Sequence, residues 1–198
     1  MLQVRDLRCP GLEPVSLAVE DGACAALTGP SGAGKSRVLR AIADLDPNTG
    51  AVLADGLDRA AVSAPQWRAR VRFLAAEPAW WAPGIGAHFP AAADVAPLMA
   101  ELDLPADCLD WPVERASTGQ RQRLALIRGL LDDPAVLLLD EPTAALDAAA
   151  RERVEALLAR RMARGTSILV ATHDMAQAAR LAGTTYRLDA GRMARVEP

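Results

Sequence analysis

The chain has 198 residues, a hydrophobic fraction of 51% and a formal net charge of -3, so it is long enough for one domain with a substantial core. A weakly acidic balance excludes the broad basic surface that nucleic-acid binding requires, and we expect no nucleic-acid partner. No apolar run approaches the roughly 18 residues of a membrane span, and Arg5, Asp6, Arg8 and Glu13 exclude a secretory leader. The three widely spaced cysteines fit reduced thiols and form neither a disulfide framework nor a zinc motif.

The N-terminal part is predicted to contain short strands and a loop-to-helix junction. Two strands lie around residues 2–4 and 15–19, and a buried strand covers residues 23–27. A glycine-rich stretch follows, and then a helix that begins near Lys35 and has Val38, Leu39 and Ile42 on its apolar side.

The glycine-rich stretch matches G-x-x-x-x-G-K-[ST], the phosphate-binding loop of nucleotide hydrolases. Its glycines allow a tight turn that brings backbone N–H groups against phosphate oxygens, and the next helix presents its positive end to the same anion. Lys35, the only lysine in the chain, can reach the β- and γ-phosphates, and Ser36 offers a hydroxyl to Mg²⁺. The predicted nucleotide contacts here are Gly29, Pro30, Ser31, Gly32, Ala33, Gly34, Lys35, Ser36 and Arg37.

The middle of the chain first continues the core and then changes in composition. The core elements predicted here are a turn at 47–50, a strand at 51–53, a turn at 55–56, a short helix at 65–70 and a buried strand at 71–75. From Pro78 to about Pro112 prolines are frequent, and three of the four tryptophans lie here. This composition predicts a small helical insertion on one side of the core.

Inside the insertion, a helix is predicted with Asp94 as its N-cap and with Val95, Leu98, Met99 and Leu102 at helical spacing. Trp80 and Trp81 are adjacent, so they cannot both face one helical stripe. They either pack within the insertion, or at least one of them is an exposed anchor for a partner. We assign no role to His88.

The C-terminal part alternates buried strands and helices, which predicts an α/β fold with a mostly parallel sheet flanked by helices. The predicted elements are a helix at 119–131, a strand at 136–139, a helix at 148–164, a strand at 167–171, a helix at 175–181 and a last strand at 186–188. Ser117 and Gln120 have the spacing of a capping box at the start of the first helix, which would also present a helix N-terminus to phosphate.

Two adjacent carboxylates, Asp140 and Glu141, end the buried strand at 136–139. In open α/β sheets, ligands gather at the carboxyl ends of the strands. Asp140 is therefore placed to hold Mg²⁺, and Glu141 to orient and deprotonate an attacking water.

In this order the motifs resemble the ATP-binding subunit of ATP-binding cassette (ABC) transporters. The phosphate loop comes first, ASTGQ at 116–120 is similar to the LSGGQ-type signature, and LLLDE at 137–141 matches Walker B with its adjacent glutamate. ALD at 145–147 is similar to the S/A-L-D loop, and THD at 172–174 to the switch histidine. The resemblance covers almost the whole chain and implies a P-loop NTPase fold with a small N-terminal antiparallel β part and a short helical subdomain.

The resemblance also implies a site and an assembly. Glu141 and His173 would be catalytic, Ser36 and Asp140 would hold Mg²⁺, and ATP would lie on the phosphate loop. Two copies, or one copy and a related cassette, would face each other head to tail, with a partner's nucleotide contacted by Ser117, Gly119, Gln120 and Asp147. A separate transmembrane permease would be the second partner. The location would be cytoplasmic, peripheral at the inner face of the cell membrane.

The chain departs from the family pattern at three places. The loop glutamine falls on Ala76, which cannot ligate Mg²⁺, although Glu77 follows directly. Residues 5–15 contain no aromatic side chain to stack on adenine, and Arg8 is the available planar group. Thr118 replaces the first glycine of the signature.

The favoured function is an ATP-hydrolysing transporter subunit in a single domain, 1–198, with a core at about 1–77 and 116–198 and an insertion at about 78–115. The alternative is a nucleotide-binding regulatory or assembly module with weak or no hydrolysis, which Ala76 favours. Cassettes that act on DNA or ribosomes carry long coiled-coil insertions or tandem cassettes, and neither fits in 198 residues.

Replacement of the single lysine tests the phosphate-loop interpretation. Lys35→Ala should weaken ATP binding at least about 100-fold, because a desolvated ammonium–phosphate contact is lost. Equilibrium titration with a fluorescent ATP analogue measures the affinity. Unchanged affinity would contradict the whole interpretation of this motif.

Overall fold

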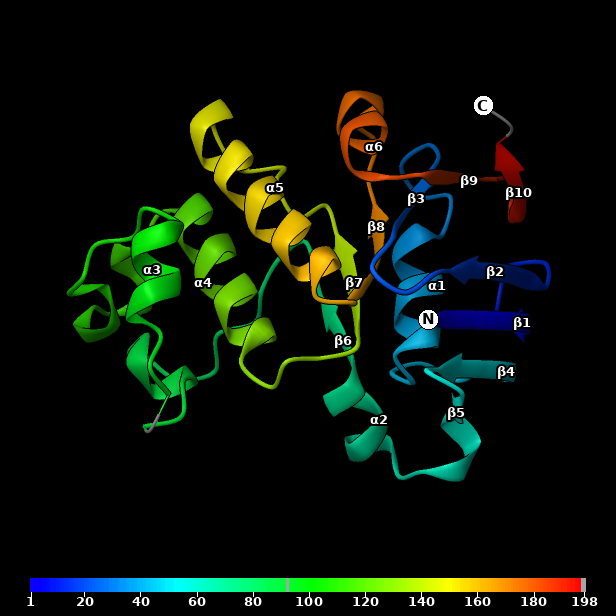
Figure 1. Cartoon of the computed structure of the whole chain (residues 1–198), viewed down its shortest axis with the longest axis horizontal. Helices are drawn as coiled ribbons and strands as arrows, with labels where there is room; N and C mark the ends of the chain where they lie inside the picture. Colours follow the sequence, from blue (N-terminus) through cyan, green and yellow to red (C-terminus); the bar gives the residue numbers. More distant parts are fainter. Residues whose placement is uncertain (92, 197–198) are drawn as a thin grey trace.

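The computed structural model describes residues 1–91 and 93–196, and its strands form two sheets (Figure 1). The strands are β1 (Leu2–Arg8), β2 (Val15–Val19), β3 (Cys24–Thr28), β4 (Thr49–Ala54), β5 (Leu57–Asp58), β6 (Val71–Leu74), β7 (Val136–Asp140), β8 (Ser167–Ala171), β9 (Thr184–Asp189) and β10 (Arg192–Val196). The α-helices are α1 (Lys35–Ile42), α2 (Ala64–Arg70), α3 (Ala96–Glu101), α4 (Thr118–Leu130), α5 (Ala148–Ala163) and α6 (Met175–Leu181).

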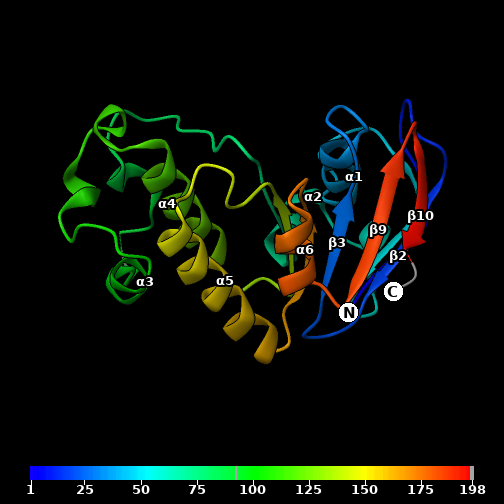
Figure 2. The ribbon, with the colours of Figure 1, turned by 90° about the horizontal axis from the view of Figure 1, so that it is seen from above.

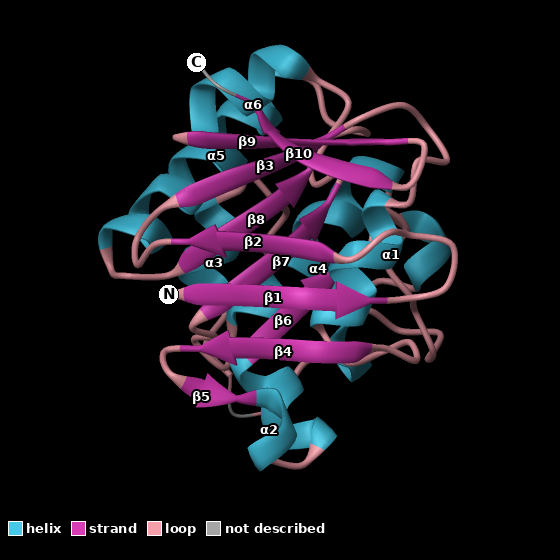
Figure 3. Ribbon diagram, turned by 90° about the vertical axis from the view of Figure 1, so that its right-hand side faces the viewer, coloured by secondary structure: helices cyan, strands magenta, loops and turns pink. Residues whose placement is uncertain are grey.

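The larger sheet has the strand order β10-β9-β3-β8-β7-β6, and only the β9–β10 pair in it is antiparallel. The smaller sheet has the order β2-β1-β4-β5 and is antiparallel throughout, and Figure 3 shows its strands in front of those of the larger sheet. The predicted fold, a mostly parallel sheet with a small N-terminal antiparallel part, is confirmed.

The larger sheet is covered on both faces, and this is why its central strands are continuous apolar runs. Helix α1 packs on one face, between the two sheets, while α4, α5 and α6 cover the other (Figure 2). Successive side chains of β7 point to opposite faces of the sheet and so belong to different cores. Leu138 packs in the core that contains α1, whereas Leu137 and Leu139 pack in the core that contains α4 and α5.

Residues 78–91 and 93–115 form an arm at the side of the larger sheet (Figure 1). The arm contains α3 and three short 3₁₀ turns, and none of its described residues belongs to a β-strand beyond one isolated bridge, Gly84 with Pro112. Buried Ile85, Leu102 and Cys108 fix it to the core that contains α4. The domain boundaries at 78 and 115 stay a prediction.

Three local predictions need correction. The strand predicted at 186–188 lies within β9 but is not the last one, since β10 follows after a tight turn in which Ala190 and Gly191 have positive φ. The N-cap of α3 is Val95, and Asp94 lies one residue earlier, where its carboxylate accepts from the Ala96 N–H at 3.3 Å. Thr49 and Gly50 belong to β4 and not to a turn, because Thr49 pairs with Arg8 of β1 and Gly50 lies directly against the Asp6 backbone.

Within the described residues, none of the helices combines the length and the apolar character that crossing a bilayer demands. Cys9, Cys24 and Cys108 are all buried and unpaired, as expected. Burial raises the pKa of Cys24 to about 12, so this thiol stays protonated and unreactive at neutral pH.

Candidate active site

Strand register brings the predicted catalytic groups to one edge of the larger sheet. Ala171 at the end of β8 lies opposite Leu27 of β3 on one side and opposite Asp140 of β7 on the other. The loop that follows β3, the carboxylates that end β7 and the residues that follow β8 therefore emerge side by side, at the carboxyl edge where α/β proteins bind ligands.

The phosphate-binding loop connects β3 to α1, and two of its glycines are required by its conformation. Gly29 has φ 146°, and a Cβ there would lie 2.0 Å from the carbonyl oxygen of Leu188. Gly34 caps α1 with φ 103°, and a Cβ there would lie 2.8 Å from the Leu12 side chain. Both positions exclude a side chain, so the loop can expose its backbone N–H groups at the start of α1.

Lys35 is buried, with only 8% of its surface exposed, and its ammonium folds back over the loop. Its Nζ donates to the carbonyl oxygens of Gly29 at 2.8 Å and Pro30 at 3.1 Å. These contacts hold the positive charge at the centre of the loop, where a phosphate oxygen can replace a carbonyl as acceptor.

Asp140 is 7% exposed and lies next to Ser36 and Lys35. Burial raises the pKa of its carboxyl group, as does the negative charge of Glu141, whereas the Ser36 hydroxyl, hydrogen-bonded to it, and Lys35 lower the pKa. A carboxylate and a hydroxyl from β7 and α1 are thus adjacent. This oxygen pair fits Mg²⁺, which is held in proteins by one or two carboxylates together with substrate phosphates.

Glu141 has an unusual backbone, with φ 47° in the left-handed region, where non-glycine residues are uncommon. Its side chain points toward the end of β8: Oε1 accepts from the backbone N–H of His173 at 3.1 Å and lies 2.8 Å from His173 Nδ1. Its Oε2 accepts from the Thr172 hydroxyl at 3.5 Å. The two residues predicted to be catalytic are therefore in direct contact.

The hollow beside the phosphate loop includes His173. This cavity of about 460 Å³ is lined by Thr28, Gly29, Pro30, His173, Met175, Arg187 and Val196. Of the predicted site residues, it is lined by Gly29, Pro30 and His173.

The backbone of Glu141 is held by a residue that the sequence analysis did not identify. Gln122 of α4 donates from Nε2 to the Glu141 carbonyl at 2.8 Å, and its Oε1 accepts from the Ala145 N–H at 3.4 Å. Gln122 is 7% exposed, and its neighbours one turn on, Ala125 and Leu126, are buried. A glutamine on the apolar side of a helix was the signal that could have indicated a buried hydrogen bond.

The signature residues lie away from the phosphate loop of their own chain. Ser117 caps α4, whose packing face is on the other side of the larger sheet from α1 (Figure 2). The predicted capping box is confirmed: the Ser117 N–H donates to Gln120 Oε1 at 2.8 Å, and the Gln120 N–H donates to Ser117 Oγ at 3.2 Å. Gly119 packs against the Ala145 carbonyl, 3.0 Å from where its Cβ would be.

Asp147 caps α5, with its Oδ1 accepting from the Ala150 N–H at 2.8 Å.

Two of the three departures from the family pattern lie at the ends of strands. Ala76 and the exposed Glu77 follow β6, next to β7. Arg8 pairs with Asp6 at 3.1 Å on the exposed end of β1.

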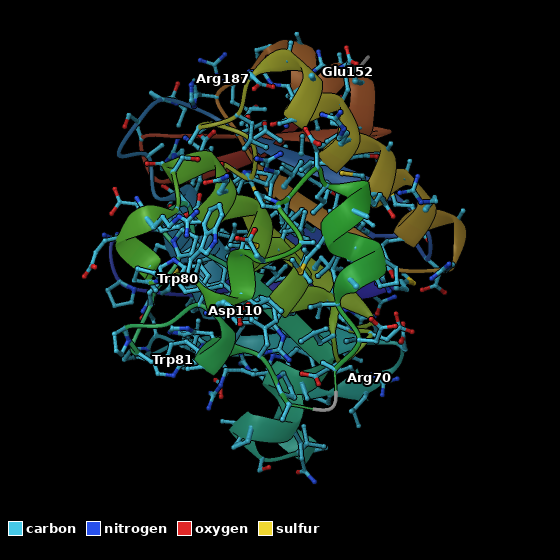
Figure 4. All side chains as sticks on the ribbon, turned by 90° about the vertical axis from the view of Figure 1, so that its left-hand side faces the viewer. Arg70, Trp80, Trp81, Asp110, Glu152 and Arg187 are labelled. Carbon is cyan, nitrogen blue, oxygen red and sulfur yellow. The ribbon has the colours of Figure 1, made fainter. Side chains whose placement is uncertain are left out.

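The two adjacent tryptophans surround a buried histidine in the arm, and Figure 4 shows them with that side facing the viewer. His88 Nε2 accepts from the backbone N–H groups of Trp81 at 2.9 Å and Ala82 at 3.1 Å, so this ring supports the local turn. Trp81 is 70% exposed, as the partner-anchor prediction requires of one tryptophan, and Trp80 is half-buried.

A family model described as ABC transporter matches residues 12–144. The chain belongs to the ABC transporter family. This ABC chain is 36% identical to Protein STAR1 of Oryza sativa subsp. japonica over 94% of its length, and 37% identical to the aliphatic sulfonates import ATP-binding protein SsuB of Burkholderia pseudomallei over 92%. It is 38% identical to the sulfate/thiosulfate import ATP-binding protein CysA of Caulobacter vibrioides over 96%. It spans only 58%, 56% and 60% of these relatives' own lengths.

Solved structures agree on the fold of this ABC chain, which is that of a P-loop NTPase. The solved structure of an ATP binding subunit of an ABC transporter has a TM-score of 0.88 at 26% identity, over 98% of this chain and 89% of that one. The cassette MJ0796 in a dimeric post-hydrolysis state with ADP and Pi has a TM-score of 0.83 at 23% identity, with both chains covered fully.

Asp140→Asn tests whether the buried carboxylate is kept for function at a cost in stability. We expect the free energy of unfolding of the variant to be higher than that of the original chain by about 0.5–2 kcal/mol at pH 7, because a buried charge is removed. The raised pKa means that the folded state holds more protons than the unfolded state between the ordinary and the raised pKa, so the stability contributed by Asp140 falls as pH rises through that window.

The stability gain of Asp140→Asn is therefore full above the raised pKa and disappears below the ordinary one. Urea unfolding at several pH values measures it, and Mg-ATP hydrolysis by the same variant should be lost. A variant that is less stable than the original chain at pH 7 would contradict the claim that burial of the Asp140 carboxylate lowers the stability of the fold.

Proposed function

We propose that this chain is the ATP-binding and ATP-hydrolysing subunit of an ABC transporter. The observation that carries the proposal is the meeting, at one sheet edge, of a glycine loop around a buried ammonium with the Asp140 carboxylate and the Glu141–His173 pair. Each group matches one demand of phosphoryl transfer: binding of the phosphates, binding of the metal, and activation of water.

The roles follow from position. Backbone N–H groups of the loop and Lys35 would bind the β- and γ-phosphates, and Ser36 with Asp140 would hold Mg²⁺, which supplies positive charge against the developing negative charge. Glu141 would accept a proton from the attacking water, and His173, 71% exposed beside it, would contact the γ-phosphate. An exposed imidazole and a carboxylate held by backbone and side-chain donors fit these two tasks.

Two cassettes are needed for a complete site. The capped start of α4, with Ser117, Gly119 and Gln120, belongs to a helix that packs on the other face of the sheet from α1, so it would bind the nucleotide of a second cassette placed head to tail. The N-terminus of a helix of 13 residues is suited to an anion. Asp147, at the start of α5, would lie near the boundary between the two copies.

A separate permease is the second proposed partner, and the location is peripheral at the inner face of the cell membrane. The exposed Trp81 borders a cavity of about 440 Å³ between the arm and the core, to which Arg72, His88 and Arg128 also contribute. The Arg128 guanidinium lies 4.8 Å from the Trp81 ring, which holds the indole in place. Tryptophan is enriched among the side chains that contribute most to protein–protein binding.

Ala76 supports one alternative, a nucleotide-binding module with weak or no hydrolysis. Its methyl group cannot orient water or bind metal, and the exposed Glu77 next to it would have to do so. The two functions differ in turnover and agree in nucleotide binding.

Glu141→Gln separates the two candidates. An amide keeps the shape of the side chain but cannot accept a proton, so we expect ATP hydrolysis to fall at least about 100-fold while ATP binding is retained. The variant should accumulate as an ATP-bound dimer, detected by size-exclusion chromatography with light scattering. A chain that binds ATP but shows no turnover, with or without a permease, supports the binding module instead.

Trp81→Ala tests the permease contact. Loss of an exposed aromatic anchor should weaken binding to the permease in detergent at least about 10-fold. Leu45→Ala, which removes another exposed hydrophobic side chain on a different surface, is the matched control. If both variants and the original chain bind the permease with equal affinity, Trp81 is not part of the permease contact.

A further inference from the structure

Gln122 joins three parts of the molecule through one buried amide. It lies on α4, it donates to the carbonyl of Glu141 at the end of β7, and it accepts from the N–H of Ala145 in the loop that follows. Both polar atoms of the side chain are thus used, and 7% of the residue is exposed. A buried amide with both hydrogen bonds made restricts its partners to one arrangement.

We propose that Gln122 is a positioning residue that fixes the orientation of Glu141 and ties it to helix α4. The inference rests on the proposed function, because it assigns Glu141 the task of activating water. The side-chain hydrogen bonds of Gln122 go to the Glu141 carbonyl and the Ala145 N–H and not to the Glu141 carboxylate or His173, so it acts through the backbone.

The backbone of Glu141 needs external support. Its φ of 47° is a conformation that costs free energy for a non-glycine residue and persists only when the surroundings enforce it. Hydrogen bonds on either side of its Cα do so: the Glu141 N–H donates to the Ala171 carbonyl at 2.9 Å, and the Glu141 carbonyl accepts from Gln122 Nε2 at 2.8 Å and, at the longer distance of 3.3 Å, from the Ala144 N–H. The bond to Ala171 comes from the sheet, and the shorter bond to the carbonyl depends on a single side chain.

Loss of the bond from Gln122 would leave the Glu141 carbonyl with only the longer bond from the Ala144 N–H and loosen the peptide that follows Glu141. Rotation of that peptide changes the direction of the Cα–Cβ bond of a strained residue and moves the carboxylate away from the His173 N–H. A displacement of about 1 Å in a reacting group can cost about 100-fold in rate. Lys35 and Ser36 lie on α1, which packs on the other face of the sheet from α4, so ATP binding should not change.

Helix α4 makes a second contact with the same loop, since Gly119 packs against the Ala145 carbonyl while Gln122 binds the Ala145 N–H. The start of α4 and Gln122 are separated by roughly one helical turn. The position of Glu141 is therefore set by the same rigid helix whose N-terminus is proposed to bind a second cassette's nucleotide.

The first test is Gln122→Met, which keeps the side-chain length and removes both hydrogen bonds. We expect kcat for ATP hydrolysis to fall about 10- to 100-fold, with KM and the affinity for a fluorescent ATP analogue unchanged within about twofold. Unchanged kcat in an active wild-type background would overturn the inference. Absence of turnover in the wild type would instead refute the proposed function.

The second test is Gln122→Glu, which retains an acceptor for the Ala145 N–H but has no donor for the Glu141 carbonyl at high pH. A carboxyl group buried against a carbonyl oxygen has a raised pKa and can donate once it is protonated. The ratio of variant to wild-type kcat should therefore rise as pH falls from about 9 to about 6. A ratio that does not vary with pH would show that Gln122 acts only through packing.

Gln177→Met is the matched control. Gln177 is also a buried glutamine, 1% exposed, and its Nε2 donates to the Thr143 hydroxyl at 2.6 Å, in the same loop but without contact to Glu141. Its substitution should lower stability by a similar amount, measured by urea unfolding, and leave kcat within about twofold. An equal loss of kcat in Gln177→Met would assign the effect to loop packing and overturn the inference. If Gln122→Met does not fold, the pH dependence of Gln122→Glu decides the question.

Discussion

The site depends on the parallel pairing of β3, β8 and β7. Their register places Leu27, Ala171 and Asp140 side by side, so the three segments that follow these strands leave the sheet at the same edge. Parallel strands buried on both faces require long crossovers, and this is why residues more than 100 positions apart meet here. Every proposed step uses groups from this edge: the phosphate loop, the two carboxylates, and His173.

The same edge concentrates buried charge. Lys35 and Asp140 both lie in the interior, and the raised pKa of Asp140 shows that burial and the neighbouring Glu141 outweigh the stabilising effects of Ser36 and Lys35. Glu141 adds a strained backbone. These features lower stability, and they are kept because a nucleotide and a metal ion need charged side chains that are free to bind them and held in one orientation. The surrounding apolar cores hold these side chains in place.

Predictions from the sequence were right where a local rule was strong. The capping box at Ser117 and the apolar runs of β7 and β8 were placed correctly, because the rule and the tertiary environment favour the same conformation. Strand β10 was missed because Arg192–Val196 is mostly exposed and has no apolar alternation. The structural role of His88 was missed because its partners are backbone N–H groups, which have no signature in a sequence.

The sequence by itself determined the chemistry available to this protein: a glycine loop with one lysine, a carboxylate pair that ends a buried strand, and a histidine after the next strand. It could do so because backbone conformation and charge are local properties of residue types. Only the tertiary structure decided that Glu141 contacts His173, that Gln122 supports the Glu141 backbone, and that the start of α4 lies away from its own phosphate loop. These relations depend on strand register and helix packing between distant segments, and no local pattern encodes them.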